Sequence, residues 1–120
     1  MPKPHSFCRD ERLTKAAEFD RVFREGWRRR GGCLTVCYAA NGLAHTRLGI
    51  ALRRGWSGAV ARNRAKRLVR EAFRTHKHEL PRGLDVVVVP VTNWEGPRVE
   101  EIAAELVRLL PRAVEGVPPC

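Results

Sequence analysis

The chain has few of the features that mark secreted, metal-binding or membrane proteins. Its four cysteines, Cys8, Cys33, Cys37 and Cys120, form no CxxC pair, so their spacing does not favour a zinc site. On a strand, Cys33 and Cys37 would lie about 13 Å apart, from a rise of about 3.3 Å per residue, which is too far for a disulfide. No signal-peptide pattern opens the sequence, and no apolar run approaches about 18 residues. We therefore expect a reduced, cytoplasmic protein with no membrane partner.

Negative charge is also scarce. The 120 residues include 23 Lys and Arg against 13 Asp and Glu, for a formal net charge of +10. Arg far outnumbers Lys, and a guanidinium group binds phosphate in a bidentate manner and stacks on bases, whereas an ammonium group acts as a point charge. This balance favours a nucleic acid as partner. The 43% of hydrophobic residues argues against disorder, and the length suits one domain with one modest core.

Positive charge and helical periodicity coincide in residues 61–74. At about 100° per residue, the small and apolar side chains form one stripe that predicts contact with a core. Basic side chains cover the rest of this helix and repel one another, with only Glu71 to offset them, so a polyanion would stabilise them. A solvated helix face is the alternative, which the one-signed charge disfavours. The predicted core stripe is Ala61, Ala65, Leu68, Val69 and Ala72; the predicted nucleic-acid-binding residues are Arg53, Arg54, Arg62, Asn63, Arg64, Lys66, Arg67 and Arg70, with Arg74 continuing the row.

The first half of the chain predicts one helix and then strands. After an irregular basic leader over residues 1–12, apolar residues at helical spacing predict a helix over Lys15–Glu25, with Thr14 as its cap and Gly26 as its stop. The basic stretch 28–32 leaves room for a short edge strand near Trp27. Strand patterns then follow over Cys33–Ala39 and Arg47–Leu52, and the turn Asn41-Gly42 between them predicts that the second strand returns beside the first.

The second half alternates helix, strand and helix. Ser57 is placed to cap the long basic helix, which we expect to end at about His76 or Lys77. The valine run in Asp85–Val91 is typical of a strand buried on both faces. Pro97 opens a last helix, and residues 113–120 form a flexible tail. The order, without repeats, predicts a small α+β sandwich in a single domain, residues 1–120.

Residues 59–71 read Ala-Val-Ala-Arg-Asn-Arg-Ala-Lys-Arg-Leu-Val-Arg-Glu. This segment resembles the signature helix of the bacterial ribonuclease P protein component, whose pattern is Ala-Val-x-Arg-Asn-Arg-x-Lys-Arg followed by an apolar pair and a basic residue. The family usually has a basic pair before a Gly-Asn-Ala-Val-like stretch, whereas here Arg53 and Arg54 stand one position early, before Gly55. Further matches follow in order along nearly the whole chain: Arg12-Leu13 with Phe19, Val22, Phe23 and Gly26, then Arg47-Leu48-Gly49-Ile50, then Pro81-Arg82-Gly83-Leu84-Asp85.

The resemblance implies a two-layer α+β sandwich of αβββαβα order, similar to the second domain of ribosomal S5. In that fold the βαβ crossover through the basic helix is left-handed. Sequence rules alone would predict the opposite hand, since about 98% of such connections are right-handed. The left-handed form therefore follows from the resemblance alone.

The resemblance also implies a role in tRNA processing. Such a protein is a subunit of the ribonuclease P ribonucleoprotein, an endonuclease and hydrolase that removes the 5′ leader of precursor tRNA. The RNA subunit is catalytic and uses Mg²⁺, while the protein binds that RNA and the leader and needs no obligate protein partner. The residues agree with this, because the acids form no evident two-metal cluster and the histidines have no obvious acid partner. We therefore expect neither catalytic residues nor metal ligands in the protein.

Phe19 and Phe23 lie one helical turn apart. Core packing and function are equally consistent with that spacing. The resemblance places both rings in a cleft where the single-stranded leader stacks, and stacking on an aromatic ring tolerates any base sequence.

A basic ribosomal or architectural RNA-binding protein without a processing role is the alternative from another class. The basic helix alone fits it equally well, but the ordered matches along the chain disfavour it. A helix-turn-helix DNA-binding protein is less favoured still, because strands surround the basic helix and leave no preceding partner helix.

Overall fold

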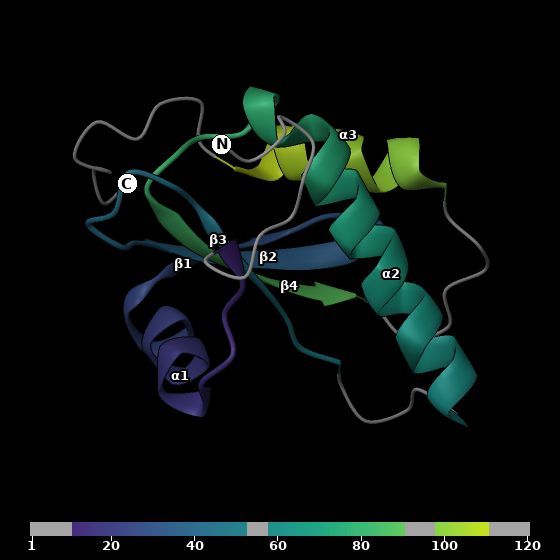
Figure 1. Ribbon diagram of the computed structural model, residues 1–120, viewed down its shortest axis with the longest axis horizontal. Coiled ribbons are helices and arrows are strands. Elements are labelled where there is room, and N and C mark those ends of the chain that lie inside the picture. The colour runs from purple at the N-terminus through teal and green to yellow at the C-terminus, as the bar shows by residue number, and fades with distance from the viewer. Residues whose placement is uncertain (1–10, 53–57, 91–97, 111–120) are drawn as a thin grey trace.

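The computed structural model describes residues 11–52, 58–90 and 98–110 (Figure 1). Helices and strands follow the predicted αβββαβα order, and the strand near Trp27 is present. The elements are α1 (Ala16–Glu25), β1 (Trp27–Arg30), β2 (Leu34–Ala40), β3 (Arg47–Ile50), α2 (Gly58–His76), the 3₁₀ turn η2 (Lys77–Glu79), β4 (Leu84–Pro90) and α3 (Val99–Leu109).

The four strands form one sheet in the order β1-β2-β4-β3. β4 runs antiparallel to β2 and parallel to β3. The prediction that β3 returns beside β2 is therefore wrong. The loop after β2 is tied to β4 instead, because the N–H of Asn41 donates to the carbonyl of Gly83 over 2.9 Å. A continuous valine run is most stable in the centre of a sheet, with both faces covered, and β4 takes that place.

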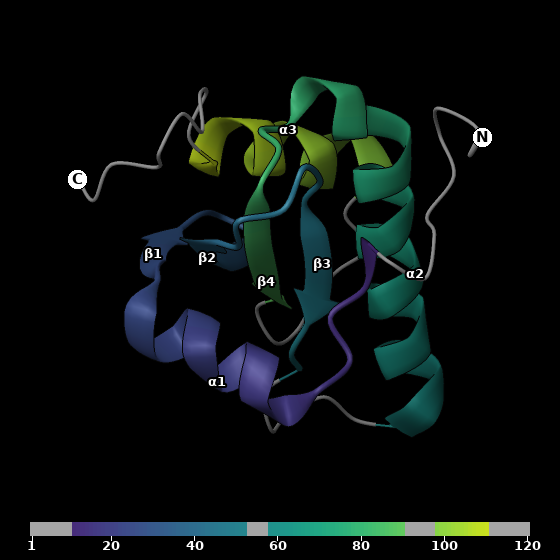
Figure 2. The ribbon, with the colours of Figure 1, turned by 60° about the vertical axis from the view of Figure 1, so that its left-hand side comes forward.

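Helices cover both faces of this sheet (Figures 1 and 2). α2 and α3 pack on one face, and alternate strand residues such as Val36, Val86 and Val88 meet them in the larger core. α1 lies on the opposite face, where Cys37 and Val87 belong to a smaller apolar cluster. The two layers of the sandwich are thus the sheet and the helices α2 and α3. The helix α1 covers the other face of the sheet.

The parallel strands β3 and β4 are neighbours joined through α2. In Figure 2 both strands run downward, with β4 to the left of β3 and α2 on the face away from α1. This arrangement is the left-handed crossover that the resemblance implies. It orients α2 so that one side packs on the sheet and the other side faces outward.

The start of α1 differs from the prediction. The helix begins one residue late, and Thr14 does not cap it. Instead, Oε1 of Glu18 accepts hydrogen bonds from the backbone N–H groups of Thr14 and Lys15, over 3.3 and 3.2 Å. The last part of the predicted leader is also ordered, since Arg12 pairs with Leu48 as an isolated parallel bridge. The chain before α1 therefore runs along the free edge of β3.

The strand ends differ by one or two residues as well. β2 begins at Leu34, because the N–H of Cys33 donates to Oε2 of Glu105 over 2.9 Å rather than to a strand. β3 ends at Ile50 instead of Leu52. Among the described residues, Cys33 and Cys37 form no disulfide, and burial together with Glu105 raises the pKa of Cys33 to about 12. The predictions for residues 1–10, Ser57, Val91, Pro97 and the tail over residues 113–120 fall outside the described residues.

Candidate nucleic-acid interface

The inward side of α2 carries the predicted core stripe. Ala65, Val69 and Ala72 are buried, as expected, whereas Ala61 and Leu68 are half-buried. Phe73 is buried too and is among the largest fully buried side chains, although the prediction omitted it. This side fixes the helix on the sheet and leaves its basic side outward.

The outward side of α2 carries most of the predicted binding residues. Arg53 and Arg54 lie outside the described residues. Lys66 is half-buried, which suits a long aliphatic stem lying on the surface with its ammonium group in water. The exposed members of the predicted set are Arg62, Asn63, Arg64, Arg67 and Arg70.

Part of this set surrounds a shallow depression of about 420 Å³, which we call the basic hollow. Arg62 and Arg64 do not line it. Arg12 does, although nothing in the sequence pairs this residue with α2. It reaches the hollow because residues 12 and 13 run along β3, which lies beside α2. The basic hollow is lined by Arg12, Asn63, Lys66, Arg67, Arg70, Glu71 and Arg74.

One ion pair lies within the basic hollow. The guanidinium group of Arg74 donates to both carboxylate oxygens of Glu71, over 3.0 and 2.6 Å. This hydrogen bonding lowers the pKa of Glu71 and raises that of Arg74. Among the described residues, Glu71 pairs with Arg74 and with none of the other basic side chains of α2. The remaining positive charges of α2 therefore face water, where they suit phosphate groups.

Phe19 and Phe23 both lie on α1 but differ in burial. Phe19 is half-buried and packs against the smaller apolar cluster. A methyl group at Gly49 would lie 2.6 Å from Cζ of Phe19, so only a glycine leaves room for this ring on β3. Phe23 is 39% exposed. Packing thus accounts for Phe19, while the ring of Phe23 remains available to a partner.

A network of charged side chains anchors α1 to the sheet. Asp85 on β4 is 1% exposed and accepts two hydrogen bonds from Arg47 on β3, over 2.8 and 2.7 Å. Asn41 donates to the same carboxylate over 3.0 Å. Arg47 also donates to Glu18 on α1 over 2.9 Å, and Arg21 forms an ion pair with Asp85 at 3.4 Å. The network therefore holds α1 at a set position over the sheet.

The network shifts the ionisation of its members. Hydrogen bonding to Asp85 raises the pKa of Arg47, against the effect of burial. Burial raises the pKa of Glu18, but the backbone N–H groups of Lys15 and Thr14, together with Arg47, outweigh burial and lower it overall. Both groups are therefore held in their charged forms.

Within the described residues, no three His, Cys, Asp or Glu side chains lie close enough to hold a metal ion. The expectation that the histidines have no acid partner is wrong for His78, whose Nε2 lies 3.8 Å from Oε2 of Glu79. In the described part of the chain, no helix is both long and apolar enough to cross a bilayer.

A family model and two related sequences all point to the same family. The family model described as Ribonuclease P matches residues 7–114. The ribonuclease P protein component of Thermotoga sp. (strain RQ2) is 40% identical over 115 residues, which cover 92% of this chain and 97% of the relative. That of Methylococcus capsulatus is 42% identical over 107 residues, covering 88% and 80%.

Solved structures give the same result. The RNase P protein from Thermotoga maritima superposes with a TM-score of 0.74 at 33% sequence identity, covering 84% of this chain and 99% of that one. The RNase P protein of Staphylococcus aureus gives a TM-score of 0.71 at 28% identity, covering 82% and 91%.

Proposed function

This chain belongs to the ribonuclease P protein family, and we propose that it binds the catalytic RNA of the ribonucleoprotein and the 5′ leader of precursor tRNA. Membership makes it a ribonuclease P protein component and implies an RNA partner. It also disfavours the alternative of a ribosomal or architectural protein. The observation that carries the proposal is the basic hollow, a concave surface whose cations on α2, other than Arg74, have no carboxylate partner among the described residues.

The outward side of α2 is the proposed contact with the RNA subunit. Its exposed guanidinium groups are spaced by helical turns and have both the charge and the geometry to bind successive phosphates. The concave shape of the basic hollow suits the curved phosphate backbone of a nucleic acid better than it suits a flat partner surface. Arg53 and Arg54, which precede this helix in the sequence, belong to the same proposed contact.

The opposite side of the molecule is the proposed contact with the leader. Phe23 offers an exposed ring, and Phe19 lies one turn before it. A ring that stacks on bases accepts any sequence, as a subunit that serves many precursor tRNAs requires. In this proposal Phe23 makes the direct contact, and Phe19 supports the surface beneath it.

In this proposal the RNA subunit, together with Mg²⁺, catalyses the hydrolysis. The bound Mg²⁺ supplies a polarised phosphate and an activated water. The protein's own residues bind and orient RNA and supply no acid, base or metal ligand.

Reconstitution tests the proposal. Protein freed of RNA, a bacterial ribonuclease P RNA, Mg²⁺ and a precursor tRNA are combined, and the products are mapped at single-nucleotide resolution. Cleavage at the mature 5′ end should require the RNA subunit and become more efficient at low Mg²⁺ when the protein is added. Cleavage by the RNA-free protein alone would overturn the assignment of catalysis to the RNA.

A further inference from the structure

β1 is one edge of the sheet, and α2 lies toward the opposite edge. The strand order β1-β2-β4-β3 places two strands between β1 and β3. Figure 2 shows α2 beside β3 and far from β1. β1 therefore lies away from the surface that we propose to contact the RNA subunit, and the charges that it carries need a separate explanation.

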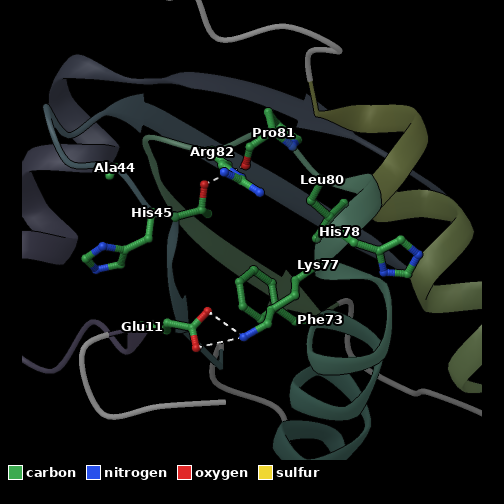
Figure 3. A pocket seen from close by; sticks show the side chains of 10 residues that line it. Glu11, Ala44, His45, Phe73, Lys77, His78, Leu80, Pro81 and Arg82 are labelled. Atoms are coloured by element: carbon green, nitrogen blue, oxygen red, sulfur yellow. Dashed lines mark hydrogen bonds and ion pairs between the residues drawn. The ribbon is translucent and has the colours of Figure 1, made fainter. Parts of the chain in front are cut away.

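β1 carries three consecutive arginines, Arg28, Arg29 and Arg30, and all three side chains are exposed. Among the described residues, none of them forms an ion pair or a side-chain hydrogen bond. Elsewhere the fold pairs its charges. In a pocket at the C-terminal end of α2, for example, Nζ of Lys77 donates to both carboxylate oxygens of Glu11 over 3.0 and 3.1 Å (Figure 3). Like charges on adjacent residues of β1 repel one another, so an external polyanion would stabilise them.

The register of β1 on β2 assigns these arginines to two faces of the sheet. Arg29 lies opposite Val36, which belongs to the larger core beneath α2 and α3. Arg28 lies opposite Cys37, which belongs to the smaller cluster on the α1 side. Side chains alternate along a strand, so Arg30 shares the face of Arg28, about 6.6 Å further along at a rise of about 3.3 Å per residue. The α1 face of β1 thus carries two arginines, and the other face carries one.

The corner between α1 and β1 is tightly packed. A single residue, Gly26, joins the two elements, and its N–H donates to the carbonyl of Val22 over 2.9 Å. A Cβ atom at this position would collide with the carbonyl oxygens of Val22 and of Tyr38 on β2. The direction of β1 relative to α1 is therefore fixed. Phe23, in the last turn of α1, is held at a set position relative to Arg28 on β1.

α1 crosses the sheet from the β3 side to the β1 side (Figure 2). The first turn of α1 is tied to β3 by the ion pair between Glu18 and Arg47 at 2.9 Å. The last turn, which carries the exposed ring of Phe23, leads directly into β1. A single strand of RNA that enters from the α2 and β3 side and passes Phe23 therefore continues toward β1.

The end of this path is positively charged. Arg24, in the last turn of α1, is exposed and adds to the charge of the β1 arginines. The exposed carboxylates of α1 are those of Asp20 and Glu25, and Glu25 lies 3.7 Å from Nε of Arg21, which offsets it. Cations therefore outnumber unpaired carboxylates where α1 meets β1, as the binding of a phosphate backbone requires.

We propose that Arg28 and Arg30 bind phosphates of the leader on the 5′ side of the nucleotide that stacks on Phe23. The RNA subunit holds the cleavage site, which is at the 3′ end of the leader, so the nucleotides that reach β1 are those farther from that site. Cations beside an aromatic ring bind single-stranded RNA without regard to its sequence. The inference rests on the proposed function, because it takes the leader as the strand that passes Phe23.

Single substitutions on the two faces of β1 are the first test. In the holoenzyme, Arg28→Ala and Arg30→Ala should each weaken binding of a precursor tRNA with a long leader by about 10-fold at low salt, as expected for one charge-assisted contact. Each should also reduce the slope of log affinity against log salt by about 0.7, the contribution of one phosphate of a single strand. Arg29→Ala, the matched control, removes the same charge from the other face and should leave both quantities unchanged. Equal effects of all three substitutions would indicate a general effect of net charge, or protection of the sheet edge, and would overturn the proposal.

Shortening the leader from its 5′ end is the second test. The losses caused by Arg28→Ala and Arg30→Ala should disappear once the leader is too short to extend past Phe23, whereas the loss caused by Phe23→Ala should persist to shorter leaders. Losses that are the same for every leader length, or that occur with mature tRNA or with the RNA subunit alone, would assign the arginines to another RNA contact and overturn the proposal.

The same measurements separate this inference from the proposed function. If the unmodified holoenzyme binds precursor and mature tRNA equally, the proposed leader contact is wrong, and the inference is wrong with it. If Phe23→Ala loses the preference for the precursor while Arg28→Ala and Arg30→Ala retain it in full, only the assignment of β1 is wrong. Circular dichroism and thermal unfolding of each variant establish that the fold is intact before affinities are compared.

Discussion

The two sides of the molecule use the same residue type for different purposes. On α2, Arg62, Arg67 and Arg70 are exposed, and no carboxylate in the described residues pairs with them. On the α1 side, Arg47 and Arg21 are bound to Glu18, Glu25 and Asp85. The first group is available to an external polyanion, whereas the second stabilises the protein itself.

This contrast shows that the pairing of a charge, rather than its presence, separates binding residues from structural ones. A guanidinium group that already donates hydrogen bonds to a buried carboxylate is not available to an external ligand, because separating the pair costs several kcal/mol, roughly 3–5. One that faces water loses little when it exchanges water for phosphate and gains from counterion release. Single and paired substitutions on the two sides test this division.

Arg47→Ala should give the largest effect, on stability. It leaves the carboxylate of Asp85, which is 1% exposed, without its main partner. Breaking a buried pair in this way typically costs about 3–5 kcal/mol, which urea unfolding measures directly. The control Arg67→Ala removes an exposed charge and should change the free energy of unfolding by less than about 0.5 kcal/mol. Similar losses in both variants would contradict the division between the two sides.

Arg62→Ala combined with Arg67→Ala should act on RNA binding and leave stability unchanged. If about six phosphates are neutralised by the intact protein, log affinity falls with log salt at a slope near −4 to −5, and the double variant should flatten it by one to two units. At low salt, affinity for the RNA subunit should fall about 100-fold, from roughly 1.5 kcal/mol per charge-assisted contact. Filter binding across a salt series gives both quantities. An unchanged slope would mean that α2 is merely solvated.

Phe23→Ala should separate leader binding from folding. Because this ring is 39% exposed, its removal should cost little stability, whereas Phe19→Ala removes a packed ring. In the holoenzyme, affinity of the Phe23→Ala variant for precursor tRNA should fall by about 1–3 kcal/mol, while affinity for mature tRNA without a leader stays the same. Equal losses for both RNAs would assign the ring to the fold or to the RNA subunit.

Glu18→Gln should give the smallest effect, visible in the pH dependence of stability. The pKa of Glu18 is lowered in the folded protein from the ordinary value of 4.5, so its charged form stabilises the fold above that pH. This stabilisation is lost as the pH falls below 4.5 toward the lowered pKa. The variant should be less stable at neutral pH by about 1 kcal/mol or less, and the difference should shrink in acid. A difference that persists unchanged at low pH would assign it to packing.

Local patterns predicted most of the elements. Helical spacing alone placed Ala65, Val69 and Ala72 on the buried side of α2, and the valine run indicated that β4 is a strand buried on both faces. The ends of the elements were less accurate, because side chains from distant segments decide them. Cys33, for example, leaves the strand to bind Glu105, 72 residues away.

The same patterns did not predict which strands lie next to each other in the sheet. A turn after β2 predicted a hairpin with β3, but the sheet inserts β4 between them. Hydrophobic periodicity reports which face of a strand is buried and carries no information about which strand lies beside it. Handedness has the same limit, since the left-handed connection through α2 runs against the general rule.

The sequence by itself determined the charge of this protein, the helix that displays it and the family to which the chain belongs. These are properties of residue type and of spacing within one segment. The tertiary structure alone decided that Arg12 joins the basic hollow. It also decided that Arg47 is bound to Asp85, 38 residues away. The physical reason is that such pairings depend on which segments the sheet brings together, and only packing of the whole chain determines that.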